Sequence, residues 1–220
     1  MPKAARSNPL ALAVLACLDE RPMHPYEVAQ TLRRRAKEQS VRLNYGSLYA
    51  VFEALEKRGF VKATGTLREG RRPERTVYEL TDEGSREMVD WLTELIGVPA
   101  KEYPAFMAGL SFLPALDPDD ALGALRGRAD ALRVKLAGLR GTLEATKRAG
   151  LPRLFELESE YEAQALEAEL SFVTGLIDAI VSETLDGLAL WRLFHTEGFD
   201  PSQVEFSLDE ASQLGPPPVS

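Results

Sequence analysis

The pattern of apolar and polar positions predicts four short helices in the first hundred residues. In the third of them, Leu48, Val51 and Leu55 recur at spacings of three and four, which places them on one helix face. Polar residues stand where helices should begin: Asn8 precedes Pro9, and Thr81 precedes two acids. We expect helices over residues 9–18, 25–35, 44–58 and 82–96.

Two β-like runs follow the third helix. They cover residues 60–66 and 75–80, and the basic turn Arg68-Glu69-Gly70-Arg71-Arg72-Pro73 lies between them. A polar and aromatic helix followed by a hairpin with a cationic tip is the arrangement of a winged helix-turn-helix. The sequence therefore predicts a small hairpin wing on a mainly helical domain that covers residues 1–97.

The second half has a different pattern, with apolar residues in a heptad repeat. After the helix start Asp117-Pro118, they recur at alternating spacings of three and four: Leu122, Leu125, Ala129, Leu132, Leu136, Leu139 and Leu143. We expect one long helix over residues 117–148 and a second over 153–185, paired as an antiparallel, coiled-coil-like hairpin. A short closing helix is expected at 188–194, and residues 198–220 read as a flexible tail.

One such hairpin leaves apolar surface uncovered, and a second copy of the chain would cover it. We therefore expect residues 98–197 to form a dimerisation domain and the protein to be a homodimer. The residues predicted to carry the contact are Leu122, Leu125, Leu132, Leu136, Leu139, Leu176 and Ile180.

The charge is divided unevenly between the two halves. The whole chain carries a formal net charge of −8, but residues 1–80 hold 15 Lys and Arg against 9 Asp and Glu. The first part is therefore cationic and suited to phosphate, whereas the remainder is strongly acidic. This division favours double-stranded DNA as the partner of the N-terminal domain.

The residues that we expect to contact DNA lie on the second and third helices and on the turn. The major groove of DNA admits one helix, and the residues in the first turns of that helix read the groove. Arginines in a wing reach phosphate or the minor groove. The predicted DNA-binding residues are Tyr26, Asn44, Tyr45, Gly46, Ser47, Tyr49, Arg71, Arg72 and Arg75. Simple packing of Tyr49 between helices, and pairing of Arg75 across the hairpin, remain alternatives.

Several short motifs occur together in residues 10–84. They are His24, Tyr26 and Glu27 at a helix start, then Gly46-Ser47-Leu48-Tyr49, Gly59-Phe60-Val61, Gly70-Arg71-Arg72-Pro73 and Leu80-Thr81-Asp82-Glu83-Gly84. As a set they resemble the PadR family of bacterial transcriptional regulators. The resemblance implies a dimeric repressor that binds an inverted-repeat operator and responds to a small-molecule signal. Pro25 and Ala50 depart from the family pattern, which usually has Gly and Pro there.

Other classes of protein fit less well. The only histidines are His24 and His195, so no histidine-based triad is credible, and neither a phosphate-binding glycine loop nor a metal-ligand motif is present. We expect no enzyme activity and no cofactor. An adaptor that uses a winged helix to bind protein, without DNA, remains the alternative function.

The single cysteine and the N-terminal apolar run bear on the compartment. Cys17 cannot form an intrachain disulfide and reads as a small buried residue, which fits a reducing cytoplasm. The apolar run from Leu10 to Leu18 ends at Asp19-Glu20 rather than at a cleavage site, so we expect a buried helix instead of a signal peptide.

Aromatic residues gather near the predicted joint between the two halves. These are Trp91, Tyr103, Phe106 and Phe112. They predict a site for a small aromatic or hydrophobic effector, while an ordinary core that links two domains is the alternative.

Overall fold

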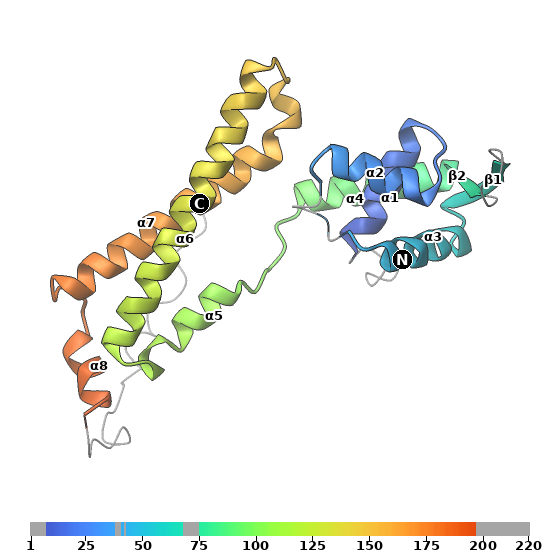
Figure 1. Ribbon diagram of the computed structural model, residues 1–220. Coiled ribbons are helices and arrows are strands. Elements are labelled where there is room, and N and C mark those ends of the chain that lie inside the picture. The colour runs from blue at the N-terminus through green and yellow to red at the C-terminus, as the bar shows by residue number, and fades with distance from the viewer. Residues whose placement is uncertain (1–7, 38–40, 42, 68–74, 197–220) are drawn as a thin grey trace, which may run out of the picture. The chain divides into compact units, whose positions relative to one another are not determined.

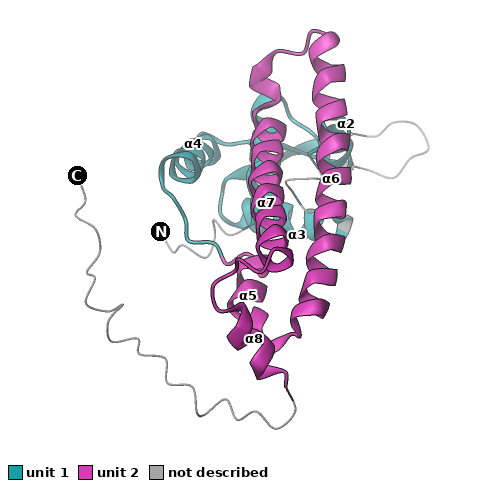
Figure 2. Cartoon of the chain, turned by 90° about the vertical axis from the view of Figure 1, so that its left-hand side faces the viewer, with its two compact units in different colours: residues 1–102 teal, residues 103–220 magenta. Residues whose placement is uncertain are grey.

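A computed structural model describes residues 8–37, 41, 43–67 and 75–196. The chain folds as two compact units, Met1–Glu102 and Tyr103–Ser220 (Figures 1 and 2). Each unit has its own apolar core. The predicted tail after residue 197 and the whole of the basic turn, which falls in residues 68–74, lie outside the described residues.

Unit 1 contains four helices and a two-stranded antiparallel sheet among its described residues. Its elements are α1 (Pro9–Glu20), α2 (Pro25–Arg34), α3 (Tyr45–Lys57), β1 (Val61–Leu67), β2 (Arg75–Leu80) and α4 (Asp82–Gly97). Val61 pairs with Leu80 and Thr66 with Thr76, and an isolated bridge joins Met23 to Tyr78. The predicted helices and hairpin are therefore confirmed, and unit 1 is a winged helix-turn-helix.

The core of unit 1 fixes the orientation of α3. Leu48, Val51 and Leu55 are buried, as the spacing predicted, and Phe52 joins them against α1 and α2. Cys17 is also buried, and burial raises the pKa of its thiol. The side of α3 opposite this core is left to solvent.

Side chains at the helix starts fix where the helices of unit 1 begin. Asn8 Oδ1 accepts from Leu10 N at 3.1 Å, and Thr81 Oγ1 accepts from Gly84 N at 3.0 Å. At α2 the His24 ring accepts from Tyr26 N, and Glu27 accepts from His24 N at 2.9 Å, which completes a capping box. Each cap satisfies backbone N–H groups that the helix itself leaves unbonded.

Unit 2 is built on two long helices that run antiparallel, side by side (Figures 1 and 2). Its elements are α5 (Ala105–Ser111), η2 (Leu113–Ala115), α6 (Pro118–Arg148), η3 (Arg153–Phe155), α7 (Leu157–Val181) and α8 (Leu188–Phe194). Asp117 Oδ1 caps α6 by accepting from Asp119 N at 2.9 Å. The predicted helical hairpin is confirmed, and α6 extends over about 46 Å at ~1.5 Å per residue.

The predicted leucine seam lies inside this hairpin. Leu125, Leu132, Leu136 and Ile180 are buried between α6 and α7 of one chain. Leu122, Leu139 and Leu176 are half-buried at the edge of the same cluster. All seven residues therefore have a role within a single copy, and contact between them and a second copy stays a prediction.

Polar contacts tie the remaining elements of unit 2 together. Arg128 Nε donates to Glu169 Oε1 at 2.6 Å, and Lys135 pairs with Glu162 at 2.7 Å. Trp191 Nε1 of α8 donates to the Leu116 carbonyl at 2.7 Å, which holds the last helix against the start of α6. Within the described ranges, none of the helices has the length and hydropathy of a membrane span.

Candidate nucleic-acid interface

The first turn of α3 is open to solvent and ordered by its own cap. Asn44 Oδ1 accepts from Gly46 N at 2.9 Å, so the carbonyl side of this amide is used inside the helix. The amide nitrogen of Asn44 can still donate outward. Ser47 is exposed, whereas Leu48 beside it is buried, so the turn is held from behind while its polar side faces solvent.

Two tyrosines expose aromatic surface on α2 and α3. Tyr26 on α2 and Tyr49 on α3 are both substantially exposed. The His24 ring meets the Tyr49 ring edge-on, with centroids 6.5 Å apart, and so joins the start of α2 to α3. Tyr49 thus packs on one neighbour while keeping surface available for a ligand.

The other predicted contacts are described only in part. A Cβ added at Gly46 would lie 3.5 Å from Asn44 Oδ1, an ordinary contact, so the free protein does not require glycine there. The Tyr45 and Arg75 side chains, and all of Arg71 and Arg72, lie outside the described residues. Their roles rest on the sequence.

The base of the wing carries an ion pair that sequence analysis missed. Lys62 on β1 lies opposite Glu79 on β2, and their charged atoms are 2.8 Å apart. The hydrogen bond to Glu79 raises the pKa of Lys62. Tyr78 packs on Phe52 with ring centroids 4.9 Å apart, and burial, followed by the charges of Glu56 and Glu53, raises the pKa of its hydroxyl. The ion pair joins the two strands of the hairpin, and the ring contact fastens the hairpin to α3.

The basic cluster at the end of α2, Arg33-Arg34-Arg35, is partly engaged in contacts within the protein. Arg35 donates to both oxygens of Glu20 at the end of α1, with Nη2 to Oε2 at 2.7 Å, and this hydrogen bonding lowers the pKa of Glu20. Arg34 donates to Thr31 Oγ1 at 3.3 Å. The Arg35 side chain therefore links α1 to α2, since its guanidinium is already paired with the Glu20 carboxylate.

The four predicted effector residues belong to different units. Trp91 is buried in the core of unit 1. In unit 2, Phe106 lies under the Arg128 guanidinium, 3.7 Å from ring centroid to Cζ, and contacts Phe172, while Tyr103 and Phe112 are exposed. A shared site at the joint therefore remains a prediction.

The described fold defines the class of protein: a winged helix-turn-helix unit in which one side of α3 is exposed, joined to a unit built on a long helical hairpin. Residues 14–90 match the sequence model of the "Transcriptional regulator PadR-like family". The predicted resemblance is thereby confirmed, and the chain carries a domain of the PadR-like family of transcriptional regulators.

Individual proteins resemble the chain over more than this domain. The negative transcriptional regulator PadR of Bacillus subtilis is 24% identical over 171 residues, which cover 76% of this chain and 93% of that protein. The crystal structure of Bacillus subtilis PadR in complex with operator DNA superposes with a TM-score of 0.63 at 20% identity, covering 78% of this chain and 98% of that one. The Vibrio cholerae virulence activator AphA superposes with a TM-score of 0.60 at 15% identity, covering 79% and 99%. The overall fold, hairpin included, is thus shared with these proteins.

Proposed function

We propose that the chain is a sequence-specific transcriptional repressor that binds an inverted-repeat operator as a homodimer. The observation that carries the proposal is the first turn of α3, which is capped, exposed and backed by a rigid core. A relative with the same fold has been crystallised on its operator, which favours DNA over the adaptor alternative. A protein that acts on DNA in this way works in the cytoplasm.

In this proposal α3 enters the major groove. Ser47 and the amide nitrogen of Asn44 reach base edges or phosphates, while Tyr26, Tyr45 and Tyr49 contact sugars, phosphates or thymine methyls. Gly46 keeps side-chain bulk out of the first turn, and the N-terminal end of a helix suits a phosphate. Arg71, Arg72 and Arg75 of the wing supply cations for the neighbouring backbone or minor groove.

Ser47→Ala should change which sequences are preferred more than it changes overall affinity. The side chain is exposed and outside the core, so its loss leaves the fold intact. A good contact to a base is worth about 1–3 kcal/mol of discrimination, so the preference for the best operator over single-base variants should fall about tenfold. Fluorescence anisotropy with a set of single-base variants measures this preference, and an equal loss on every sequence would refute a base-reading role.

Asn44→Asp is the companion variant. It retains an oxygen that can accept from Gly46 N, so α3 keeps its cap, but it replaces the outward amide donor with a carboxylate. The loss of the outward donor and the added negative charge both weaken DNA binding, while the helix remains formed. We therefore expect weaker binding to every sequence without a lower unfolding temperature.

The face that we propose for the second copy is the outer face of the hairpin. Small and apolar residues follow α6 at spacings of three and four, and all are exposed: Ala124, Gly127, Ala131, Val134, Gly138, Gly141 and Ala145. A Cβ added at Gly127, Gly138 or Gly141 would meet nothing within 4 Å. On α7 the exposed residues Tyr161, Ala165, Ala168, Phe172 and Gly175 repeat the pattern.

Such a stripe suits another helix. A heptad repeat keeps one face in register with a partner helix, and small residues allow two helix backbones to approach closely. A two-fold dimer also places two copies of α3 on two half-sites, as an inverted repeat requires. Three of the predicted contact residues are half-buried at the edge of the leucine seam: Leu122, Leu139 and Leu176. We propose that they extend the contact with the second copy.

We also propose that operator binding responds to a small hydrophobic or aromatic molecule. Bacillus subtilis PadR, which has this fold, has been crystallised with p-coumaric acid. The predicted effector residues Trp91, Tyr103, Phe106 and Phe112 supply aromatic surface, of which Tyr103 and Phe112 are exposed in their unit. A ligand that binds better to one separation of the two reading helices shifts the population toward that separation.

A further inference from the structure

The side chain of His24 lies where α2 begins and contacts both α2 and α3. Pro25, the first residue of α2, has no N–H, so the first backbone donor that this helix leaves unbonded is that of Tyr26. The His24 ring accepts from it, with 3.0 Å between Tyr26 N and Nδ1. Asn, Asp, Ser and Thr are the usual residues at this position of a helix, so an imidazole cap is uncommon.

This cap requires one form of the imidazole. A backbone N–H can only donate, so Nδ1 of His24 carries no proton, and the single ring proton of the neutral side chain lies on Nε2. A second proton would enter at Nδ1, where it would face the Tyr26 N–H and the positive end of the α2 dipole. Protonation of the ring therefore breaks the hydrogen bond that caps α2.

The same ring supports an exposed aromatic residue of α3. The centroids of the His24 and Tyr49 rings are 6.5 Å apart and their planes are inclined at 73°, which is an edge-on contact. Tyr26 and Tyr49 are the two exposed tyrosines that we propose as DNA contacts. His24 thus holds the first through its backbone and the second through its ring.

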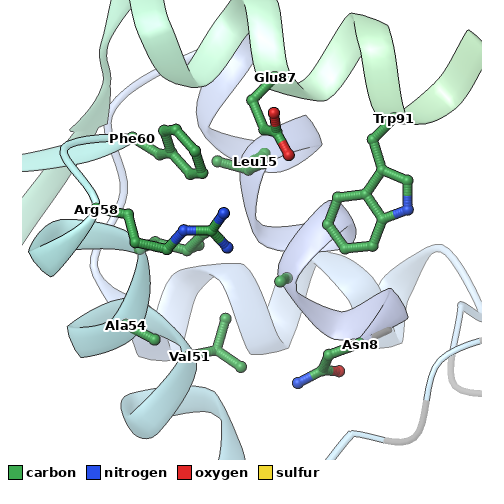
Figure 3. A pocket seen from close by; sticks show the side chains of 10 residues that line it. Asn8, Leu15, Val51, Ala54, Arg58, Phe60, Glu87 and Trp91 are labelled. Atoms are coloured by element: carbon green, nitrogen blue, oxygen red, sulfur yellow. The ribbon is translucent and has the colours of Figure 1, made fainter. Parts of the chain in front are cut away.

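The core alone does not hold every side of α3 equally. Leu48 and Phe52 are fully buried, but a cavity of about 210 Å³ lies beside the face that carries Val51, Ala54 and Arg58 (Figure 3). Empty space supplies no packing contacts to oppose a tilt of the helix. The contact between His24 and Tyr49 opposes such a tilt from the other end of α3.

We propose that His24 is a positioning residue for operator binding, and that it acts only as the neutral imidazole with its proton on Nε2. It acts through Tyr26 and Tyr49, whose placement it fixes. This role rests on the proposed function, because it concerns how the DNA-contacting surface is held. Protonation releases both the start of α2 and the support of Tyr49, so operator affinity is full while the ring is neutral and falls as the pH falls through its titration.

The groups that surround the ring keep their charge while His24 changes its own. The titratable side chains that face the two rings come from the turn before α2 and from α2, α3 and β2: Arg21, Tyr26, Glu27, Tyr49, Glu53, Glu56 and Tyr78. Glu27 accepts from His24 N at 2.9 Å, and its other oxygen lies 3.5 Å from Arg21 Nη2. Burial raises the pKa of the Tyr78 hydroxyl. Arginine, glutamate and tyrosine ordinarily hold one charge state between pH 5 and 8, whereas histidine changes within that range.

The test measures the operator affinity of the full-length protein from about pH 7.5 down to about pH 5.5 at constant salt. We expect binding to weaken about threefold to tenfold, the effect of one lost helix cap. The chain has two histidines, so two variants assign the change. His24→Asn supplies a cap that accepts from Tyr26 N and does not titrate, so it should abolish the pH dependence, and without the ring against Tyr49 it should bind about threefold more weakly at pH 7.5. His195→Asn, at the end of α8 in unit 2, is the matched control and should keep the pH dependence.

A second readout needs no DNA. In isotope-labelled protein, the imidazole nitrogen resonances of His24 should show the proton on Nε2 at about pH 7.5, and acidification should speed exchange of the Tyr26 amide relative to its intrinsic rate. Equal or tighter operator binding at low pH, a pH dependence that survives His24→Asn or is lost in His195→Asn, or a proton on Nδ1 near neutral pH overturns the role of His24. A protein with the expected tautomer and amide exchange that binds no DNA at any pH overturns the proposed function, and this role with it, so the two failures are distinguishable.

Discussion

Gly84→Ala is expected to unfold the N-terminal unit. Gly84 lies in the first turn of α4, where that helix crosses the start of the wing, and an added Cβ would come to 2.0 Å from the Phe60 carbonyl oxygen and 2.8 Å from Leu80 Cδ1. The oxygen cannot retreat easily, because it accepts from Thr81 N at 3.0 Å. Relief requires movement of a backbone on which both the wing and α4 depend, so we expect a loss of about 3 kcal/mol or more in the free energy of unfolding.

Gly97→Ala is the matched control on the same helix. A Cβ at Gly97 would meet nothing within 4 Å, so alanine should be neutral or stabilising by up to about 1 kcal/mol. Urea unfolding followed by tryptophan fluorescence compares the two variants, since Trp91, one of the two tryptophans of the chain, is buried in the affected core. If the Gly84→Ala protein unfolds at the same urea concentration as the unaltered chain, α4 does not approach the Phe60 carbonyl as closely as described here.

The second large effect is expected at Val134. Val134 is 75% exposed on α6, so Val134→Glu should leave the hairpin of a single copy folded. At a helix–helix contact between two copies the same change buries two carboxylates in the stripe, which is strongly unfavourable. We therefore predict that Val134→Glu converts the dimer to a monomer with unchanged helix content, measured by light scattering and circular dichroism.

Leu132→Asp, two residues earlier, should behave differently. Leu132 is 8% exposed and lies between α6 and α7, so a carboxylate there unfolds the hairpin itself and lowers the helix content. Ala137→Glu, on the exposed flank between the inner seam and the outer stripe, adds the same charge and should remain dimeric. A folded Val134→Glu dimer of unaltered mass would place the contact between copies elsewhere.

Local signals predicted much of the fold. β2 occupies Arg75–Leu80, as the β-like run and the preceding turn indicated, and the polar residues Asn8, Thr81 and Asp117 all cap helices as predicted. These features depend on neighbours within a few residues in the sequence. Such short-range chemistry can be read from one chain without knowledge of its folding.

The features that sequence analysis missed join distant residues or lack a hydrophobic signal. The Arg35–Glu20 ion pair joins two helix ends 15 residues apart, and the cavity lined by Leu15, Leu55 and Trp91 takes its walls from α1, α3 and α4. The leucine seam of α6 is covered by α7 of the same chain, as the predicted hairpin requires, and its contact with a second copy stays a prediction. The outer stripe of alanine and glycine went unnoticed because residues this small give no apolar periodicity, although small size is what allows a close helix contact.

The central claim is that two copies of α3 read one DNA duplex. Its most direct test is to recover the fragments that the purified, full-length protein binds from the genome of its source, and to read the repeats within them. We predict enrichment of inverted repeats whose half-site centres lie about 10 or 20 base pairs apart, one or two helical turns. Recovery of no enriched sequence, or of single sites without a symmetric partner, would contradict the account.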